Sequence, residues 1–282
     1  MPLTFGSHQA LVLPLKMLKP RWFDGTALVI GSMAPDLFFL THGTAWYVDA
    51  HAVGPQVLLT IPVTLVLTWV IKSFIVGPLG AQLPDAGGFH LRDYQRLSQW
   101  RLPRRALGWF VLITSALVGS LSHLAFDSFT HGFGWVVQCV AVLRHQVFVL
   151  PTAFQDQPIY AYDVLQVAGT VVGTIVTIWC LWEIGRRRMV CSWYPDRPAQ
   201  KSTSASRRAV NIGVILGLAL GLGLAAATMR IGGGQDLLIR VAVVTWLGLL
   251  VGCLIANPRM EEERPMDALP EPGSVPPEQT SG

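Results

Sequence analysis

Three polar side chains recur at four-residue intervals near the end of an apolar run: His123, Asp127 and His131. Residues four apart share one face of a helix, so the spacing predicts a single polar stripe. Imidazole and carboxylate groups bind zinc and other divalent transition metals. Asp127 could alternatively accept a hydrogen bond from a ligating histidine and so orient it. Thr130 and the following glycine-rich turn predict a helix end before His131, which favours His123 and Asp127 as ligands.

A second candidate is Asp36, which follows Pro35 inside the apolar stretch "IGSMAPDLFFLTHG", with His42 six residues later. Pro35 removes a backbone donor and predicts a broken helix. An isolated carboxylate in a membrane helix is costly, so Asp36 is expected to face a partner or water rather than lipid.

Two further histidines stand at the starts of expected helices. His51 follows Asp49 in "VDAHAVG", and Ser7 is predicted to cap a helix that carries His8 in its first turn. Each residue alone is equally well explained by a hydrogen bond to a neighbouring carbonyl. Their shared position at or near the ends of apolar segments favours a metal-binding or proton-handling site.

The composition identifies the scaffold that must position these groups. The chain is 51% hydrophobic and 13% charged over 282 residues, with a mean hydropathy of +0.46, whereas soluble domains carry roughly 25% charged residues. We therefore predict an all-α fold, a polytopic integral membrane helical bundle of about five to six transmembrane helices. Five apolar stretches approach the roughly 20 residues needed to cross the bilayer: Val53–Val76, Ala106–Phe126, Val164–Ile184, Ala209–Met229 and Leu237–Ala256.

Three shorter apolar stretches are harder to place. Ala27–Thr41, interrupted at Pro35, is expected as a short sixth crossing, and Ala10–Leu18 and Trp135–Leu150 as interfacial or re-entrant helices. Lys and Arg concentrate in the linkers after Val53–Val76 and Val164–Ile184. The positive-inside rule places these linkers and the C-terminus in the cytoplasm, and the loops with His42, His51 and His131 outside. The net charge of +4 therefore reflects basic loops that set the orientation of the chain in the membrane, and no nucleic-acid partner is expected.

Four regions follow from these patterns. Residues 1–185 form a membrane domain with the candidate metal site, 186–208 a flexible cytoplasmic linker, 209–257 a two-helix membrane scaffold, and 258–282 a disordered C-terminal tail rich in Pro and Glu. The scaffold helices lack ionisable residues at their centres and carry small residues suited to close packing. The four cysteines are scattered without a paired motif, which favours packing over a zinc knuckle.

The segments "FGSHQALVLPL", "ALVIGSMAPDLFFL", "DAHAVGPQVLLTIPVTLVLTWVIK", "LVGSLSHLAFDSFTHGFGW" and "YDVLQVAGTVVG" resemble an uncharacterised bacterial membrane family, the domain of unknown function DUF4184. More distantly the pattern is similar to membrane-bound metal-dependent hydrolases. That resemblance implies a metal site formed by His8, Asp36, His51, His123 and Asp127, in a multi-pass protein of the bacterial cytoplasmic (inner) membrane. In that family a serine usually follows the histidine at the position of His51; this chain has Ala52 there.

We therefore expect a metal-dependent hydrolase acting on an ester or phosphoester of an amphiphilic, lipid-like small molecule at the bilayer. The expected cofactor is a divalent metal, zinc by default with manganese or magnesium as alternatives, and Asp36 or Asp127 would accept the proton of the attacking water. His131 and His42 are secondary ligand candidates. A small transporter or proton-coupled membrane protein would also use intramembrane Asp and His. Metal-dependent isoprenoid diphosphate chemistry is a further alternative, and a structural protein with internal polar pairs is another.

Overall fold

The computed structural model describes residues 6–41, 45, 47–48, 53–151, 156–195, 200–228, 234–257 and 261–262. Five helical segments are long and apolar enough to cross a membrane: Val57–Gly80, Ala106–Cys139, Ala161–Arg186, Ser204–Ala227 and Leu237–Ala256. The prediction of an all-α membrane bundle is confirmed. The first span is irregular. Its π-helices η3 (Gln56–Thr60) and η4 (Ile71–Ile75) flank α5 (Ile61–Val70), and α6 (Val76–Gly80) ends it.

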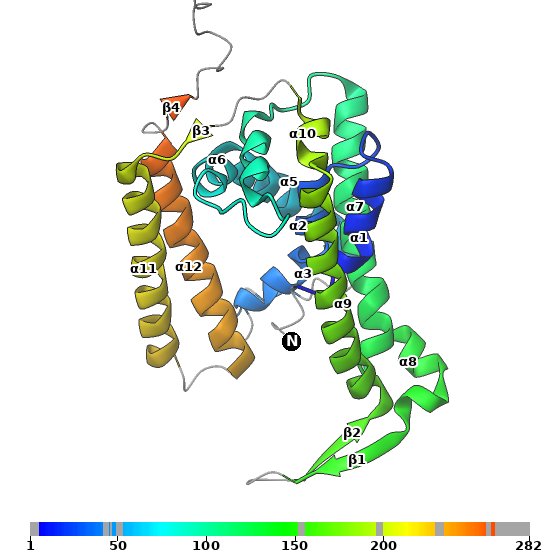
Figure 1. Cartoon of the computed structure of the whole chain (residues 1–282). Helices are drawn as coiled ribbons and strands as arrows, with labels where there is room; N and C mark the ends of the chain where they lie inside the picture. Colours follow the sequence, from blue (N-terminus) through cyan, green and yellow to red (C-terminus); the bar gives the residue numbers. More distant parts are fainter. Residues whose placement is uncertain are drawn as a thin grey trace, which may run out of the picture.

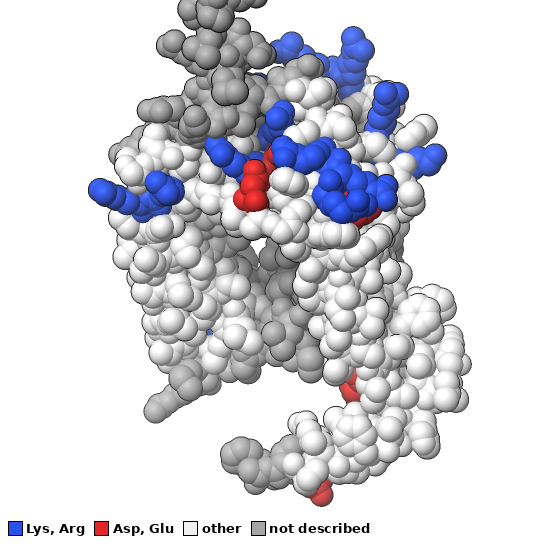
Figure 2. All heavy atoms as spheres, in the orientation of Figure 1, with Lys and Arg blue, Asp and Glu red and all other residues white. Residues whose placement is uncertain are grey.

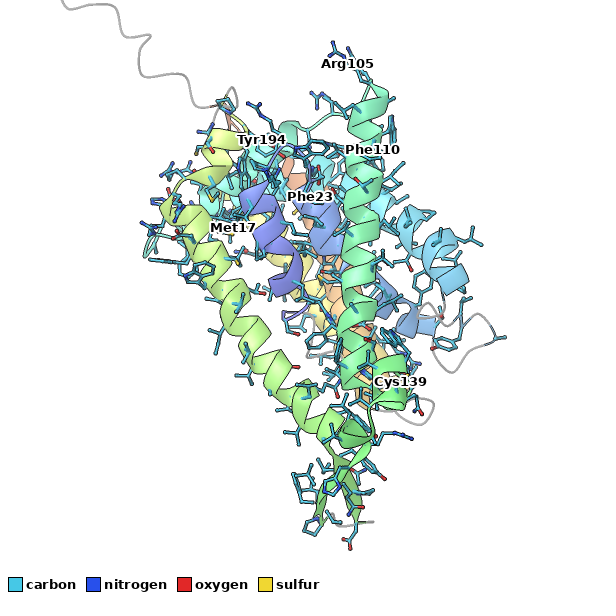
Figure 3. All side chains as sticks on the ribbon, turned by 90° about the vertical axis from the view of Figure 1, so that its right-hand side faces the viewer. Met17, Phe23, Arg105, Phe110, Cys139 and Tyr194 are labelled. Carbon is cyan, nitrogen blue, oxygen red and sulfur yellow. The ribbon has the colours of Figure 1, made fainter. Side chains whose placement is uncertain are left out.

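The other long helices form two groups (Figure 1). Helix α7 (Ala106–Thr130) runs beside α9 (Ala161–Arg186), whereas α11 (Ser204–Ala227) and α12 (Gly234–Ala256) form a hairpin on the opposite side of the molecule. Figure 3 shows α7 along its full length, with the short helix α1 (Gln9–Leu18) and α9 beside it. The prediction that α7 ends before His131 is confirmed, because the helix ends at Thr130 and His131 caps it.

The expected sixth crossing, Ala27–Thr41, is instead a broken segment. Helix α2 (Gly25–Gly31) is followed by α3 (Ala34–Leu37) and the 3₁₀ turn η2 (Phe38–Thr41). Seven residues of α2 span only about 10 Å, too short for a bilayer. The break falls just before Pro35, which occupies the first turn of α3, where its missing N–H costs nothing. Among the described residues, this segment is not one of the helices long enough to cross.

One local prediction is wrong, and another is correct only in part. Ser7 does not cap α1: the cap position is His8, and its side chain makes no capping hydrogen bond. Within Trp135–Leu150, the short helices α8 (Trp135–Cys139) and η6 (Ala141–Arg144) give way to strand β1 (Gln146–Leu150), which pairs antiparallel with β2 (Gln157–Tyr160). The run Val147-Phe148-Val149 favours strand because β-branched and aromatic side chains suit a pleated backbone.

Basic side chains gather at the opposite end of the molecule from this hairpin (Figure 2). There η5 (Leu91–Gln99) and α10 (Met189–Trp193) connect the spans, and β3 (Gln200–Lys201) pairs with β4 (Glu261–Glu262). The region 186–208, expected as a linker, therefore contains α10 and the first residues of α11. Most of the expected tail, 258–282, lies outside the described residues.

Close backbone contact fixes α2 against α7. A Cβ on Gly31 would lie 2.6 Å from the Ala116 carbonyl oxygen, and one on Gly119 would lie 2.4 Å from that of Leu28. Both distances are shorter than a methyl group tolerates, so glycine is required on each side of the crossing. The contact holds the short helix α2 at a defined height along α7.

Candidate metal centre

Three side chains from separate elements converge in the bundle. His8 precedes α1, Asp36 lies on α3 and His123 on α7, and one ligand atom from each lies within 4.8 Å of the other two. All three are buried, with exposed fractions of 1%, 5% and 0%. His123 is about 25 Å along α7 from Ala106 and about 10 Å from its other end. The cluster therefore lies in the half of the span remote from the basic linkers.

The backbone break before Asp36 orients His123. Helix α2 ends at Gly31, and the Ser32 carbonyl lies 3.0 Å from His123 Nδ1. A carbonyl only accepts, so Nδ1 carries the proton and donates it. The remaining nitrogen, Nε2, lies 3.1 Å from Asp127 Oδ2 and 3.5 Å from Asp36 Oδ1. This is the arrangement of a metal-ligating histidine whose other nitrogen is fixed by a carbonyl.

His8 stacks on His123 with ring centroids 4.2 Å apart and meets the edge of Phe126 at 5.0 Å. His8 is buried, and burial disfavours a charged imidazole. Within the part of the chain that the structure describes, its buried Nδ1 has no hydrogen-bond partner. Such an atom is costly unless something binds it, and a neutral imidazole nitrogen is a good metal ligand.

Asp127 connects the cluster to His131. Its Oδ2 faces His123, whereas its Oδ1 lies 3.5 Å from His131 Nδ1. The amide nitrogen of Gln166 on α9 lies 3.1 Å from His131 Nε2. The amide donates to Nε2, so the proton of a neutral His131 is on Nδ1, which lies 3.2 Å from Thr130 Oγ1 and also faces Asp127. His131 thus lies beside Asp127 and does not join the three converging ligand atoms.

The donor set fits a divalent ion. Two imidazoles and a carboxylate, with a second carboxylate beside them, match the nitrogen and oxygen ligands of catalytic zinc. Binding of a single ion would bring these ligand atoms, now within 4.8 Å of one another, closer together.

The structure brings together four of the five residues proposed as ligands: His8, Asp36, His123 and Asp127. His51 and the secondary candidate His42 lie outside the described residues, as does Asp49. The Asp36 and Asp127 carboxylates proposed as proton acceptors both approach His123 Nε2, with Asp127 the nearer.

Sequence reasoning missed a second buried polar group toward the basic end. Lys72, in η4 of the first span, pairs with Asp24, and its ammonium lies 4.8 Å from the Trp100 ring centroid. Asp24 also accepts the Ala27 N–H at 3.0 Å and caps α2, and its own N–H donates to Ser115 Oγ at 2.8 Å. A lysine inside an otherwise apolar span can be recognised from the sequence as a candidate functional residue.

Burial and neighbouring charges shift the pKa values of Asp24 and of nearby Lys16. Burial alone would raise the pKa of Asp24, but the Lys72 charge and the capping hydrogen bond outweigh it, and the pKa falls. Burial lowers the pKa of the neighbouring Lys16 to about 8, with Asp24 opposing that shift. Lys16 Nζ donates to the carbonyls of Pro20 at 2.7 Å and Phe23 at 2.9 Å. These contacts fix the chain entering α2, at the end remote from Asp36.

Comparison with known proteins places the whole membrane region in one family. No curated protein and no solved structure matches the chain. The family model for a domain of unknown function, DUF4184, matches residues 1–257, which include all five spans and the His–Asp cluster. The chain therefore belongs to the DUF4184 family.

Proposed function

We propose that the protein is a membrane-embedded metal-dependent hydrolase. The observation that supports this most strongly is the convergence of His8, Asp36 and His123, with Asp127 against the same His123 nitrogen. Two buried carboxylates beside two imidazoles form a strong cation site, because charge buried without a counter-ion is costly. Imidazole nitrogen in the set favours zinc or manganese over magnesium, which prefers all-oxygen ligands.

The residues divide into two roles. His8, Asp36 and His123 would hold the ion, and Asp127, which lies beside His131, would accept the proton of the attacking water. Such an ion would supply a water of lowered pKa and Lewis-acid polarisation of the substrate oxygen. Asp127 can pass that proton to the leaving group, so its carboxylate is regenerated in each cycle.

The position of the site supports a proposal for the substrate class. The cluster lies in the hydrophobic span, and exposed aromatic side chains lie at its end of α7 and in the segment that follows: Phe129, Phe133 and Trp135. Tryptophan favours the membrane–water interface. We therefore propose an amphiphilic ester or phosphoester, with its reacting group at the His–Asp cluster and its chain in the bilayer.

Metal content tests the proposal. Elemental mass spectrometry of detergent-purified wild type should find about one zinc or manganese per chain, and His123→Ala and Asp36→Asn should lose it. His145→Ala is the matched control, because His145 is exposed beside the β1–β2 hairpin, and it should retain the metal. Metal-free wild type that is folded would sink the proposal. Metal-loaded protein would then be assayed on phospholipids and other lipid phosphoesters.

A proton-coupled transporter is the second candidate, favoured by one observation. Thr60, Thr64, Thr68 and Lys72 follow at four-residue spacing along the first span, and all four are fully buried. Together with Asp24 they form a row of polar side chains that extends from the metal cluster toward the basic end. Proton uptake into proteoliposomes, followed with an internal pH dye and abolished in Lys72→Met, would favour transport over hydrolysis.

We also propose that the basic end and the C-terminus face the cytoplasm of a bacterial inner membrane. Support comes from the gathering of Lys and Arg at one end of the bundle (Figure 2). Cys139 at the opposite end is exposed, whereas Cys191 lies on α10 at the basic end. A membrane-impermeant maleimide applied to intact cells should label Cys139 and spare Cys191; labelling of Cys191 alone would reverse the orientation.

A further inference from the structure

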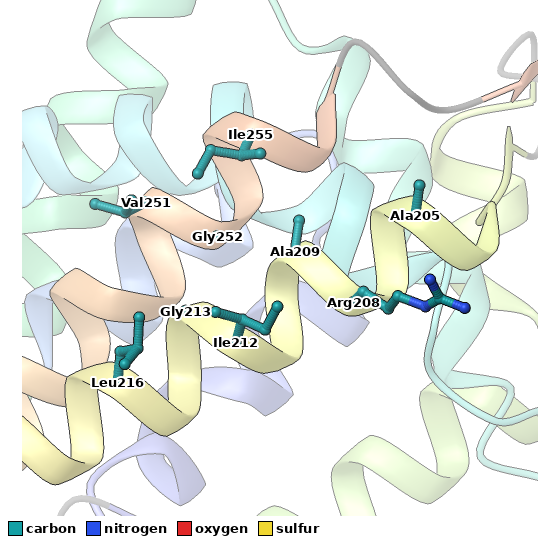
Figure 4. Close-up of a pocket in the computed structure, with 9 residues that line it drawn as sticks. All are labelled: Ala205, Arg208, Ala209, Ile212, Gly213, Leu216, Val251, Gly252 and Ile255. Carbon is teal, nitrogen blue, oxygen red and sulfur yellow. The ribbon is translucent and has the colours of Figure 1, made fainter.

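A groove runs between α11 and α12, on the side of the molecule away from the candidate metal centre (Figures 1 and 4). Its volume is about 340 Å³, within the range of small-ligand sites. Gly213 and Gly252 form the floor, Ile212, Val251 and Ile255 line the walls, and Arg208 lies toward the basic end.

The groove results from how closely the two helices pack. A Cβ on Gly213 would lie 2.3 Å from the Gly248 carbonyl oxygen, and one on Gly252 would lie 2.7 Å from that of Ala209. Backbones in such contact leave no side chain along the seam, while branched side chains rise on both sides. Ile212, Val251 and Ile255 are 55%, 53% and 47% exposed. On membrane-spanning helices, these side chains face hydrocarbon, so the seam accommodates a linear apolar chain.

Arg208 places a positive charge at one end of the groove, which favours an anionic ligand group there. It is exposed and lies four residues after the start of α11, at the basic end where lipid headgroups meet the span. A guanidinium offers several donors in a geometry that fits phosphate. Basic pockets between membrane helices bind anionic lipid headgroups.

We propose that this groove is a binding site for an anionic phospholipid, with one acyl chain along Gly213 and Gly252 and the phosphate on Arg208. A second copy of the chain fits less well, because a two-fold interface on this groove would bring two Arg208 side chains together. The site is separate from the His–Asp cluster, so the lipid bound here is a structural or regulatory ligand and not the proposed substrate.

Lipid titration of delipidated protein, followed by native mass spectrometry in detergent, tests the proposal. The two probes are phosphatidylglycerol and phosphatidylcholine with identical acyl chains. Wild type should bind phosphatidylglycerol more tightly, and Arg208→Ala should weaken that binding about fivefold, as expected for one basic contact. Arg207→Ala is the matched control: Arg207 is exposed and adjacent but does not line the groove. Equal affinity for both lipids, or an equal loss in both Arg variants, would overturn the proposal.

A second pair of variants tests the acyl-chain contact. Val251→Trp should fill the groove and weaken binding of both lipids, whereas Leu238→Trp, an exposed position near the other end of α12, should leave binding unchanged. Because both side chains face outward, neither substitution disturbs the helix seam. Unchanged lipid binding in Val251→Trp would overturn the proposal, and so would a wild-type dimer that this substitution dissociates.

Discussion

The Lys72–Asp24 pair offers the sharpest quantitative test of the fold, because both partners are buried and come from different elements. The Lys72 side chain is 1% exposed and that of Asp24 is 10% exposed. Replacing Lys72 by Met keeps the length and apolar stem but leaves the Asp24 carboxylate buried without its ammonium partner. Breaking a buried pair in this way costs about 3–5 kcal/mol, so the free energy of unfolding of Lys72→Met should fall by that amount.

The reverse change should cost a similar amount. Asp24→Asn keeps a side-chain oxygen that can accept the Ala27 N–H and cap α2, but it leaves the Lys72 ammonium buried and unpaired. The double variant removes both charges together, so its free energy of unfolding should lie within about 1 kcal/mol of wild type. A coupling energy of several kcal/mol is therefore expected between the two positions.

Equilibrium unfolding in mixed micelles, followed by circular dichroism, measures all four proteins. The single variants should also lose about 6–20 °C in Tm, and the double variant should recover most of that loss. Additive losses, with the double variant the least stable, would refute the reasoning. They would mean that each side chain acts through its own packing rather than through the pair.

Three further outcomes follow from the structure. Gly119→Ala should destabilise the fold by about 1–3 kcal/mol, because its Cβ would lie 2.4 Å from the Leu28 carbonyl; Gly223→Ala, with open space around its Cβ, should be neutral or stabilising in the same unfolding assay. His131→Ala should reduce metal affinity about 10–100-fold without abolishing binding, measured by competition with a chelating dye; complete loss would make His131 a ligand. Lys16 has a pKa of about 8 in the folded chain against 10.5 normally, so the unfolded chain binds more protons between these values. The free energy of unfolding should therefore rise between pH 8 and 10, and Lys16→Met should remove that rise.

The scaffold was the most predictable part of this protein. Hydrophobic runs such as Ala106–Phe126 and Leu237–Ala256 must be buried in lipid as helices, because only there are all backbone groups paired internally. The end of α7 at Thr130, just before His131, followed from a local turn signal. The strand at Gln146–Leu150 was missed, because a short apolar run fits helix and strand equally well until its partner is known.

The candidate site was predictable residue by residue, but its assembly was not. His123 and Asp127 share a helix face, so spacing alone related them. His8 and Asp36 reach them through tertiary packing that depends on where α2 ends. Lys72 and Asp24 were missed because neither belongs to the histidine pattern, although a charge inside an apolar span is itself a signal.

Helix α2 links the two polar groups and explains why a broken helix suits this site better than a sixth crossing. Asp24 anchors its first turn to Lys72 and Ser115, and Gly31 holds its last turn against α7. A helix that ends inside the bundle leaves its last carbonyls without intrahelical partners. One carbonyl beyond that end, on Ser32, accepts from His123 Nδ1. The break thus supplies the acceptor that directs His123 Nε2 toward the carboxylates, which an unbroken helix would keep within its own backbone.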